Sequence, residues 1–367
     1  MHFGEPVSER RLSSLLRPGE GIDTVITADV YGTGEADRAL GLALEGLDRD
    51  SYCLIGTIGH DFYSGTRNGA KGFPRFTDPA LRGEGEYAEY IRMATERSLE
   101  RCGVEHFDVL MLHNPDSIGY RSDAVWEGMA AVRESGLTRL LGLAPGPANG
   151  FTLDIIDCLE RFGSMIDWAM IILGPLEPWP GEFVLPVAER QGVRIITRVV
   201  DYGGLFHDDV LPGHAFPEYD HRRFRPGGWV EAGRGKLELM RPLAERHGLT
   251  MLQLACLWCL GQPAVSSVVP TLIQESGPGA RPVEEKRAEL AAVAGLARSL
   301  SPEELAEIRS IGDNSGSMAL KGASLEHEGS PLPDRWGIDP ELSALAERWS
   351  IDPGRDLVMG AGRPAAV

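Results

Sequence analysis

Short apolar runs alternate with amphipathic segments along most of this chain, and this alternation constrains the fold more than any other feature. Apolar, β-branched runs of this length predict strands, and the segments between them predict helices. Strands that alternate with helices are typical of a parallel sheet covered by helices. The predicted strands lie at residues 25–26, 52–57, 107–112, 137–143, 166–173, 193–198 and 264–269.

The order of these elements matches a (β/α)8 TIM barrel, and 367 residues suit such a barrel with insertions. Only seven strands are found, because residues 1–7 alone precede the first predicted helix at 8–17. Three explanations stay open: His2, Phe3 and Gly4 are the remnant of a first strand, the barrel is open there, or the start codon is wrongly chosen. We therefore predict an α/β barrel that is shortened at its N-terminus.

The C-terminal part of the chain differs in composition from the predicted barrel. Ser301, Pro302 and Glu304 predict a helix start, with a serine cap and a capping box. Beyond it the chain is rich in Gly and Ser, and one more helix is expected at 341–349. We predict a barrel over 1–312 and a C-terminal extension over 313–367 that packs on the barrel, either across its mouth or on its outside.

Composition excludes several classes of partner. A net charge of −18 argues against nucleic acid and against an anionic membrane surface, since both need a basic face. No apolar stretch is long enough to span a membrane, and the N-terminus lacks the pattern of a signal peptide. Five scattered cysteines suit a reducing compartment, and Cys256 and Cys259 are expected in the core, without metal. We expect a cytoplasmic protein with a small-molecule substrate, no nucleic-acid partner and no membrane partner.

Two strand ends carry motifs of a known family. The segment 27–32, Thr-Ala-Asp-Val-Tyr-Gly, resembles the Asp-Thr-Ala-x-x-Tyr-Gly segment of the aldo-keto reductases. His113, with Pro115 and Asp116 after it, resembles the His-x-Pro-Asp of that family, and the resemblance extends over about residues 20–312. It implies that Tyr31 gives a proton to a substrate carbonyl, that His113 orients this carbonyl, and that the nicotinamide of NADP or NAD supplies the hydride.

The remaining two catalytic positions of the family hold other residues here. Ile26 stands where the family has its aspartate, and Ile58 stands where it has its lysine. Replacing a buried ion pair by two apolar side chains is physically consistent, because losing one partner alone would leave an uncompensated charge. The sequence predicts that both isoleucines fill one hole beside Tyr31, which would then be a weaker proton donor.

The cofactor positions of the family are changed as well. Ala144 and Pro145 occupy the places of a Ser-Asn pair that binds the nicotinamide amide, and Glu289 replaces an asparagine near the adenosine phosphate. Thr271, Arg281 and Glu285 remain as candidate cofactor contacts. The resemblance implies NADP or NAD, and the substitutions leave open that no cofactor binds.

Further polar residues at predicted strand ends are candidates for substrate binding. They are Asp29, His60, Asp61, Arg198 and Asp201. With Tyr31 and His113 they would form a site for acid–base chemistry. The alternative is structural: His60 and Asp61 on a solvated loop, and Arg198 paired with Asp201.

Three functions follow from these observations. The first is a divergent NAD(P)(H)-dependent oxidoreductase acting on a small carbonyl, sugar or alcohol. The second is a cofactor-independent isomerase or lyase, acting on a sugar-like or cyclic substrate, with Tyr31 and His113 as acid and base. The third is a non-catalytic ligand-binding protein on the same barrel.

Overall fold

One parallel sheet organises the molecule. The structure is a computed structural model, and it describes residues 3–68, 72–146, 152–296, 300–316 and 338–357. The order of the strands in the sheet follows the chain, so each strand pairs with the next one. The strands are β1 (Thr24–Ala28), β2 (Cys53–Ile58), β3 (Phe107–His113), β4 (Thr138–Ala144), β5 (Trp168–Ile172), β6 (Arg194–Arg198) and β7 (Val265–Val269). The prediction of seven parallel strands is confirmed.

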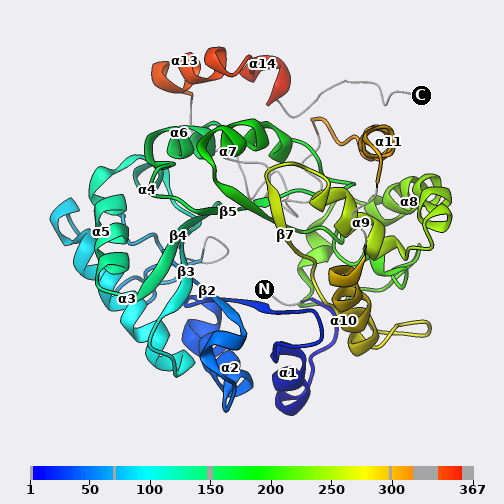
Figure 1. Cartoon of the computed structure of the whole chain (residues 1–367), viewed down its shortest axis with the longest axis horizontal. Coiled ribbons are helices and arrows are strands. Elements are labelled where there is room, and N and C mark those ends of the chain that lie inside the picture. The colour runs from blue at the N-terminus through cyan, green and yellow to red at the C-terminus, as the bar shows by residue number, and fades with distance from the viewer. Residues whose placement is uncertain (1–2, 69–71, 147–151, 297–299, 317–337, 358–367) are drawn as a thin grey trace.

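Helices cover the outer side of this curved sheet, as in a TIM barrel (Figure 1). Ser122, Thr250 and Ser301 cap three of them as expected from their residue type, since each side chain accepts a hydrogen bond from the first turn. The helices are α1 (Glu9–Leu16), α2 (Glu35–Leu44), α3 (Tyr87–Cys102), α4 (Ser117–Arg121), α5 (Asp123–Glu134), α6 (Thr152–Phe162), α7 (Leu185–Gln191), α8 (Trp229–Arg246), α9 (Met251–Leu260), α10 (Val283–Ala292), α11 (Pro302–Gly312), α13 (Pro340–Arg348) and α14 (Pro353–Asp356). Helix α10 was not predicted, because charged residues crowd its sequence and leave it without an apolar stripe.

The core has two layers, one on each face of the strands. An outer cluster lies between the sheet and the helices and includes Leu54 and Ile58 of β2. A smaller inner cluster fills the barrel, and Ile26 packs against it. Successive side chains of a strand point to opposite faces, which accounts for this division. The buried members of the inner cluster are Ile55, Val109, Met111, Ala144, Met170 and Ile196.

Within the described residues, no strand joins β7 to β1. The segment after Phe3 instead packs on the loops that follow β7 and β6: Glu5 N donates to Gln274 O at 2.7 Å, and Gly4 N donates to Asp220 Oδ2 at 2.7 Å. Gly4 has a φ of 60°, and a Cβ there would meet Gln274 O. Phe3 and Gly4 are therefore not a remnant of a strand, and His2 lies outside the described residues.

The described part of the C-terminal extension lies on the outside of the barrel. Helix α13 packs against α6, and both lie near α14 at the top of Figure 1. Trp179 Nε1 donates to Asp356 O at 2.6 Å, and Arg190 stacks over Trp349 at 4.1 Å. Residues 317–337 and 358–367 fall outside the described residues, so their position relative to the mouth stays a prediction.

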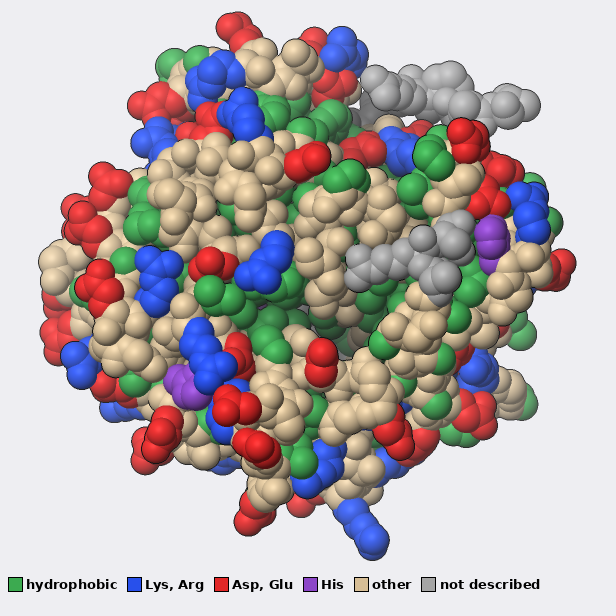
Figure 2. Space-filling model, in the orientation of Figure 1, with side chains coloured by type: hydrophobic (Ala, Val, Ile, Leu, Met, Phe, Trp, Pro, Cys, Tyr) green, Lys and Arg blue, Asp and Glu red, His purple; other side chains and the backbone are tan. Residues whose placement is uncertain are grey.

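The surface carries both signs of charge. Figure 2 shows acidic and basic side chains interspersed over the visible face, around a central area of hydrophobic side chains. Among the described helices, none combines the length and the apolar character that crossing a membrane requires.

Candidate functional site

The turn after β1 presents Tyr31 to solvent. Gly32, Thr33 and Gly34 follow with φ of 60°, 52° and 97°, three left-handed residues in succession. Glycine adopts this conformation without steric cost, which explains two of the three residues. Tyr31 is 46% exposed although it is aromatic, so a substrate can reach its phenol. In a parallel barrel, the carboxyl ends of the strands form the mouth where active sites lie.

Three aromatic rings from three consecutive strand ends meet at this mouth. The ring centroids of Tyr31 and His113 are 5.7 Å apart at an interplanar angle of 85°. Those of His60 and His113 are 5.2 Å apart at 67°. Tyr31 follows β1, His60 follows β2 and His113 ends β3. The structure therefore brings the two catalytic candidates together and adds His60, which is buried and not on a solvated loop.

His60 is enclosed by its neighbours. Its Nδ1 lies 2.7 Å from Arg75 Nη1 and 3.2 Å from Phe73 O. Its Nε2 lies 3.1 Å from Asn114 Nδ2. Burial, assisted by the charge of Arg75, lowers the pKa of His60 to about 3.

His113 is also neutral. Burial, followed by the charges of His60, Arg75 and Arg198, lowers the pKa of His113 well below its ordinary value. The side chain is 7% exposed, and its Nδ1 has no hydrogen-bond partner among the described residues. A neutral imidazole in contact with Tyr31 can hydrogen-bond a carbonyl oxygen without giving up a proton.

Arg198 ends β6 and reaches across to the segment after β4. Its Nη2 donates to Pro145 O at 3.2 Å and to Gly146 O at 3.1 Å. Val199 follows with a φ of 63°, a strained conformation for a β-branched residue. The expected ion pair with Asp201 is absent from the described contacts. Asp201 instead accepts from Gly204 N and from the loop after β7, each at 2.7 Å.

Asp29 and Asp61 point away from the mouth, toward the helices. Asp61 pairs with Arg82 and accepts from Tyr63 N at 3.0 Å. Both oxygens of Asp29 are buried without a hydrogen-bond partner among the described residues. Burial, and then the charge of Asp37, raises the pKa of Asp29 well above its ordinary value. Both side chains are fully buried, and their role in substrate binding stays a prediction.

The two isoleucines do not fill one hole. Ile26 packs on the inner cluster, but Ile58 belongs to the outer cluster and is fully buried against the helices. Thr57 is the inward-facing residue at the end of β2. Gly59, two residues later, is on the same face, and a Cβ added there would meet His113 O. Neither Lys236 nor Lys286, the two lysines of the described chain, contacts Tyr31; both bond elsewhere.

The candidate cofactor contacts gather at the loop after β7. Thr271 O lies 2.9 Å from His207 Nε2, and Arg281 Nη1 donates to His207 O at 2.9 Å. Arg281 also pairs with Glu289 at 3.0 Å and keeps 33% of its side chain exposed. Glu285 is exposed on the first turn of α10. Glu284 in the same turn pairs with Arg11, so Glu285 is the carboxylate of this turn that would oppose an anion.

These residues do not fit a nicotinamide carboxamide. His113 is in register with Ala144, so the side chain beside the catalytic ring is a methyl group. Pro145 offers no N–H, and its carbonyl already accepts from Arg198. No side-chain donor or acceptor of the described β4 end is left for a carboxamide, and Arg281 alone remains as a cation for the distant phosphates.

Two site residues were missed in the sequence. Asn114, with a φ of 48°, and Arg75 complete the contacts of His60, and Arg75 Nε donates to Asn114 O. Asn114 was recognisable, because it directly follows His113. Arg75 comes from a long loop in which nothing in the sequence distinguishes it, and only the folded loop places it here.

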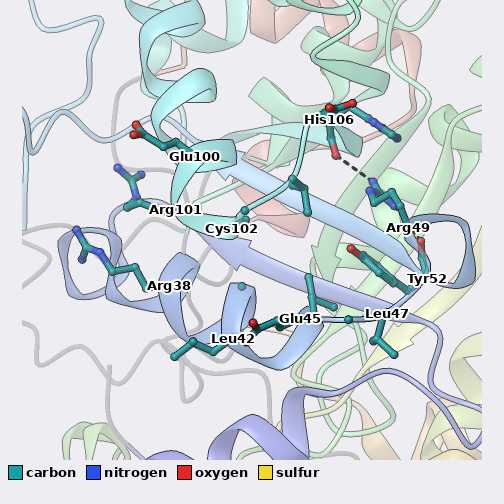
Figure 3. A pocket seen from close by; sticks show the side chains of 16 residues that line it. Arg38, Leu42, Glu45, Leu47, Arg49, Tyr52, Glu100, Arg101, Cys102 and His106 are labelled. Carbon is teal, nitrogen blue, oxygen red and sulfur yellow. Dashed lines mark hydrogen bonds between the residues drawn. The ribbon is translucent and has the colours of Figure 1, made fainter.

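A hollow of about 780 Å³ lies elsewhere, between α2 and α3 (Figure 3). Leu42, Glu45, Arg49, Tyr52 and Cys102 line it, and Arg49 Nη2 donates to the carbonyl of His106 at 3.0 Å. Residues 49 and 106 precede β2 and β3, so the hollow is at the amino ends of the strands. Because barrel active sites lie at the opposite end, it is separate from the mouth.

Comparison with known proteins agrees with this geometry. The Aldo/keto reductase family matches residues 16–313. A probable voltage-gated potassium channel subunit beta of Arabidopsis thaliana is 25% identical over 284 residues, which are 75% of this chain and 81% of that protein. A probable aldo-keto reductase 1 of Glycine max is 24% identical over 335 residues, 89% of this chain and 86% of that protein.

Solved structures share the fold. The glycerol dehydrogenase of Gluconobacter oxydans has a TM-score of 0.63 and 21% identity, covering 90% of this chain and 87% of that one. An aldo/keto reductase of Klebsiella pneumoniae in complex with NADP and acetate has a TM-score of 0.55 and 20% identity, covering 83% and 86%.

Proposed function

The chain belongs to the aldo/keto reductase family, a family of oxidoreductases, and on that premise we propose that it interconverts a small carbonyl compound or sugar and its alcohol with NAD or NADP. Contact between Tyr31 and His113, at a ring-centroid distance of 5.7 Å, is the observation that carries this proposal. These two residues come from different strands, and both stand where the family has its tyrosine and histidine.

Each residue has a distinct role in the proposed reaction. The phenol of Tyr31 donates a proton to the carbonyl oxygen, and neutral His113 donates a hydrogen bond to the same oxygen and orients it. His60 positions His113 by packing against its ring at 5.2 Å.

A bound nicotinamide would supply the hydride, and here the residues disagree with the family. The end of β4 offers no side-chain hydrogen bond to the carboxamide, so any nicotinamide would be held more weakly than in the family. A solved neighbour from Klebsiella pneumoniae that contains NADP supports cofactor use by this fold. The acidic first turn of α10 favours NAD over the 2′-phosphate of NADP.

The poor fit of the β4 end to a nicotinamide carboxamide favours a second candidate function. An isomerase or lyase needs proton transfer but no nicotinamide, and Tyr31 and His113 suffice for it as acid and hydrogen-bond partner. The methyl group of Ala144 beside His113 supports this alternative. We place either activity in the cytoplasm, with a small-molecule substrate and neither nucleic acid nor membrane as partner. All five cysteines are free thiols, as a reducing compartment requires.

Titration with NADH and NADPH, followed by calorimetry, separates the candidates. Binding at micromolar cofactor, together with reduction of a panel of small aldehydes and ketones, supports the oxidoreductase. No binding at millimolar cofactor excludes it. The second candidate then requires conversion of a sugar-like substrate without cofactor, and loss of that conversion in Tyr31→Phe. A ligand that stabilises the protein equally in Tyr31→Phe would point to binding without catalysis.

A further inference from the structure

Arg198 is a cation without a counter-ion at the centre of the proposed site. Its hydrogen bonds within the described residues are two, both from Nη2 to backbone carbonyls. No Asp or Glu of the described chain forms an ion pair with it. A guanidinium carries five N–H groups, so the donors on Nε and Nη1 have no hydrogen-bond partner among the described residues. The residue is partly exposed, so a ligand in the mouth can reach it.

Buried arginines elsewhere in this molecule are compensated. Arg222 is fully buried and lies between Asp220 and Glu275, at 2.7 Å and 2.5 Å. Arg101 pairs with Asp37 at 2.9 Å. Arg225 is coupled to the charges of Glu177 and Asp201 and lies over the ring of Trp229 at 4.3 Å from the centroid. A cation removed from water is costly unless it is paired, so the exception at Arg198 requires an explanation.

The groups around Arg198 leave its charge uncompensated. The residues whose electrostatics couple to it are Tyr31, Tyr120 and His113, none of them a carboxylate. Asp201, the carboxylate nearest in sequence, is turned into the loop after β7. Arg75 adds a second guanidinium on the His60 side of His113. The mouth is thus locally positive although the whole chain carries −18, and such a region attracts small anions.

We propose that Arg198 binds an anionic group of the substrate, a carboxylate or a phosphate ester, while Tyr31 and His113 act on a carbonyl of the same molecule. Nη1 can donate a charge-assisted hydrogen bond to one oxygen of such a group, whose negative charge the guanidinium then compensates. The substrate is then a small oxo acid or sugar phosphate, or the corresponding alcohol. This inference rests on the proposed function for the carbonyl chemistry, but the anion site stands independently of it.

Matched substrates that differ only in the charged group test the proposal. We would compare succinic semialdehyde with butanal, and glyceraldehyde 3-phosphate with glyceraldehyde, in the wild type, Arg198→Gln and Arg198→Lys. The expected wild-type preference, measured as the ratio of kcat/KM values, is about 10- to 100-fold for the anionic member of at least one pair. Arg198→Gln should lose this preference through KM, with less than about threefold change for the neutral member. The pair that shows the preference identifies carboxylate or phosphate.

If Arg198 has only a structural role, Arg198→Gln should lower kcat/KM equally for both members of a pair, and that result overturns the proposal. Equal wild-type rates for charged and neutral substrates also overturn it. Arg194→Gln is the matched control, because Arg194 lies at the other end of β6, stacked on Trp168 at 4.0 Å from the ring centroid. If Arg198→Gln fails to fold, Arg198→Lys decides: it keeps the charge but loses the guanidinium donors, and the preference should fall without vanishing.

Binding without turnover separates this inference from the proposed function. Calorimetry with succinate and with inorganic phosphate, neither of which can react, reports the anion site alone. Binding to the wild type and not to Arg198→Gln supports the inference even if no aldehyde is reduced. Equal binding to both proteins, or none to either at tens of millimolar, overturns it even if aldehydes are reduced. A loss of NADH affinity in Arg198→Gln, with unchanged substrate preference, would assign the arginine to the cofactor instead.

Discussion

The two halves of the barrel mouth differ in how their polar groups are used. At the ends of β1, β2 and β3, the rings of Tyr31, His60 and His113 contact one another. At the ends of β4 and β6, an alanine and a proline face an arginine whose hydrogen bonds go to backbone carbonyls. The first half brings together groups that can handle a proton, and the described end of β4 in the second half carries an alanine and a proline, whose side chains offer no hydrogen bond.

This contrast shows how independently the strand ends of a barrel can change. Each end contributes its own side chain to the mouth, so residues of one half can be replaced without disturbing the other. Membership of a family therefore establishes the fold, whereas the chemistry depends on the residues at each end.

The largest expected effect tests the β1–β3 half. Tyr31→Phe should reduce turnover by about 10²- to 10⁴-fold, because the proton donor is removed. Its free energy of unfolding should stay unchanged, since the side chain is 46% exposed. Tyr219→Phe is the control, a tyrosine exposed to a similar degree at 47% on a loop. Steady-state rates and urea unfolding measure both quantities, and equal rates in Tyr31→Phe and the wild type would remove this half from the chemistry.

The next largest effect concerns which face of β2 carries Ile58. Ile58→Lys should lower the free energy of unfolding by about 3–5 kcal/mol, because it places an unpaired charge in the outer cluster. Ile26→Lys should cost less, since Ile26 is partly exposed at the inner cluster. Urea unfolding of both variants measures the difference. A stable, more active Ile58→Lys would instead mean that position 58 faces Tyr31, as the sequence had suggested.

A smaller effect is the pH dependence of the free energy of unfolding that Asp29 causes, because this side chain points toward the helices and not into the barrel mouth. The pKa of Asp29 is raised in the folded state, so above about pH 4 the folded protein holds a proton that the unfolded chain has lost. Stability therefore falls as pH rises. Asp29→Asn lacks this dependence, and its stability relative to the wild type should increase by up to about 1.4 kcal/mol per pH unit. Unfolding at pH 5, 6 and 7 measures this slope.

Asp208 provides the control for that slope. Burial alone would raise the pKa of Asp208, but hydrogen bonds from Arg241 and Arg234 lower this pKa below its ordinary value. Its carboxylate is ionised in both states between pH 5 and 7, so Asp208→Asn should shift stability equally at each pH. A parallel shift in Asp29→Asn as well would show that Asp29 is ionised in the folded protein.

The smallest effect tests the cofactor half. Glu285→Gln should strengthen NADPH binding about two- to fivefold and leave NADH binding unchanged, because it removes one negative charge from the first turn of α10. Calorimetric titration of both cofactors measures the change. An equal change for NADH, or none for NADPH, would place the 2′-phosphate away from this turn.

Much of the fold was predictable because it depends on local patterns. All seven strands were found, and Ser301 and Glu304 marked the start of α11, where a capping box forms. Helix α10 and Arg75 were missed, because neither has a periodic or motif signal of its own.

By itself the sequence determined that apolar runs become parallel strands and that Tyr31 and His113 stand at two of their ends. Only the tertiary structure decided that Ile58 faces the helices and that Arg198 and Asp201 stay apart. The physical reason is geometric: a shift of one residue reverses the face of a strand, and an ion pair forms only where two loops bring its partners together.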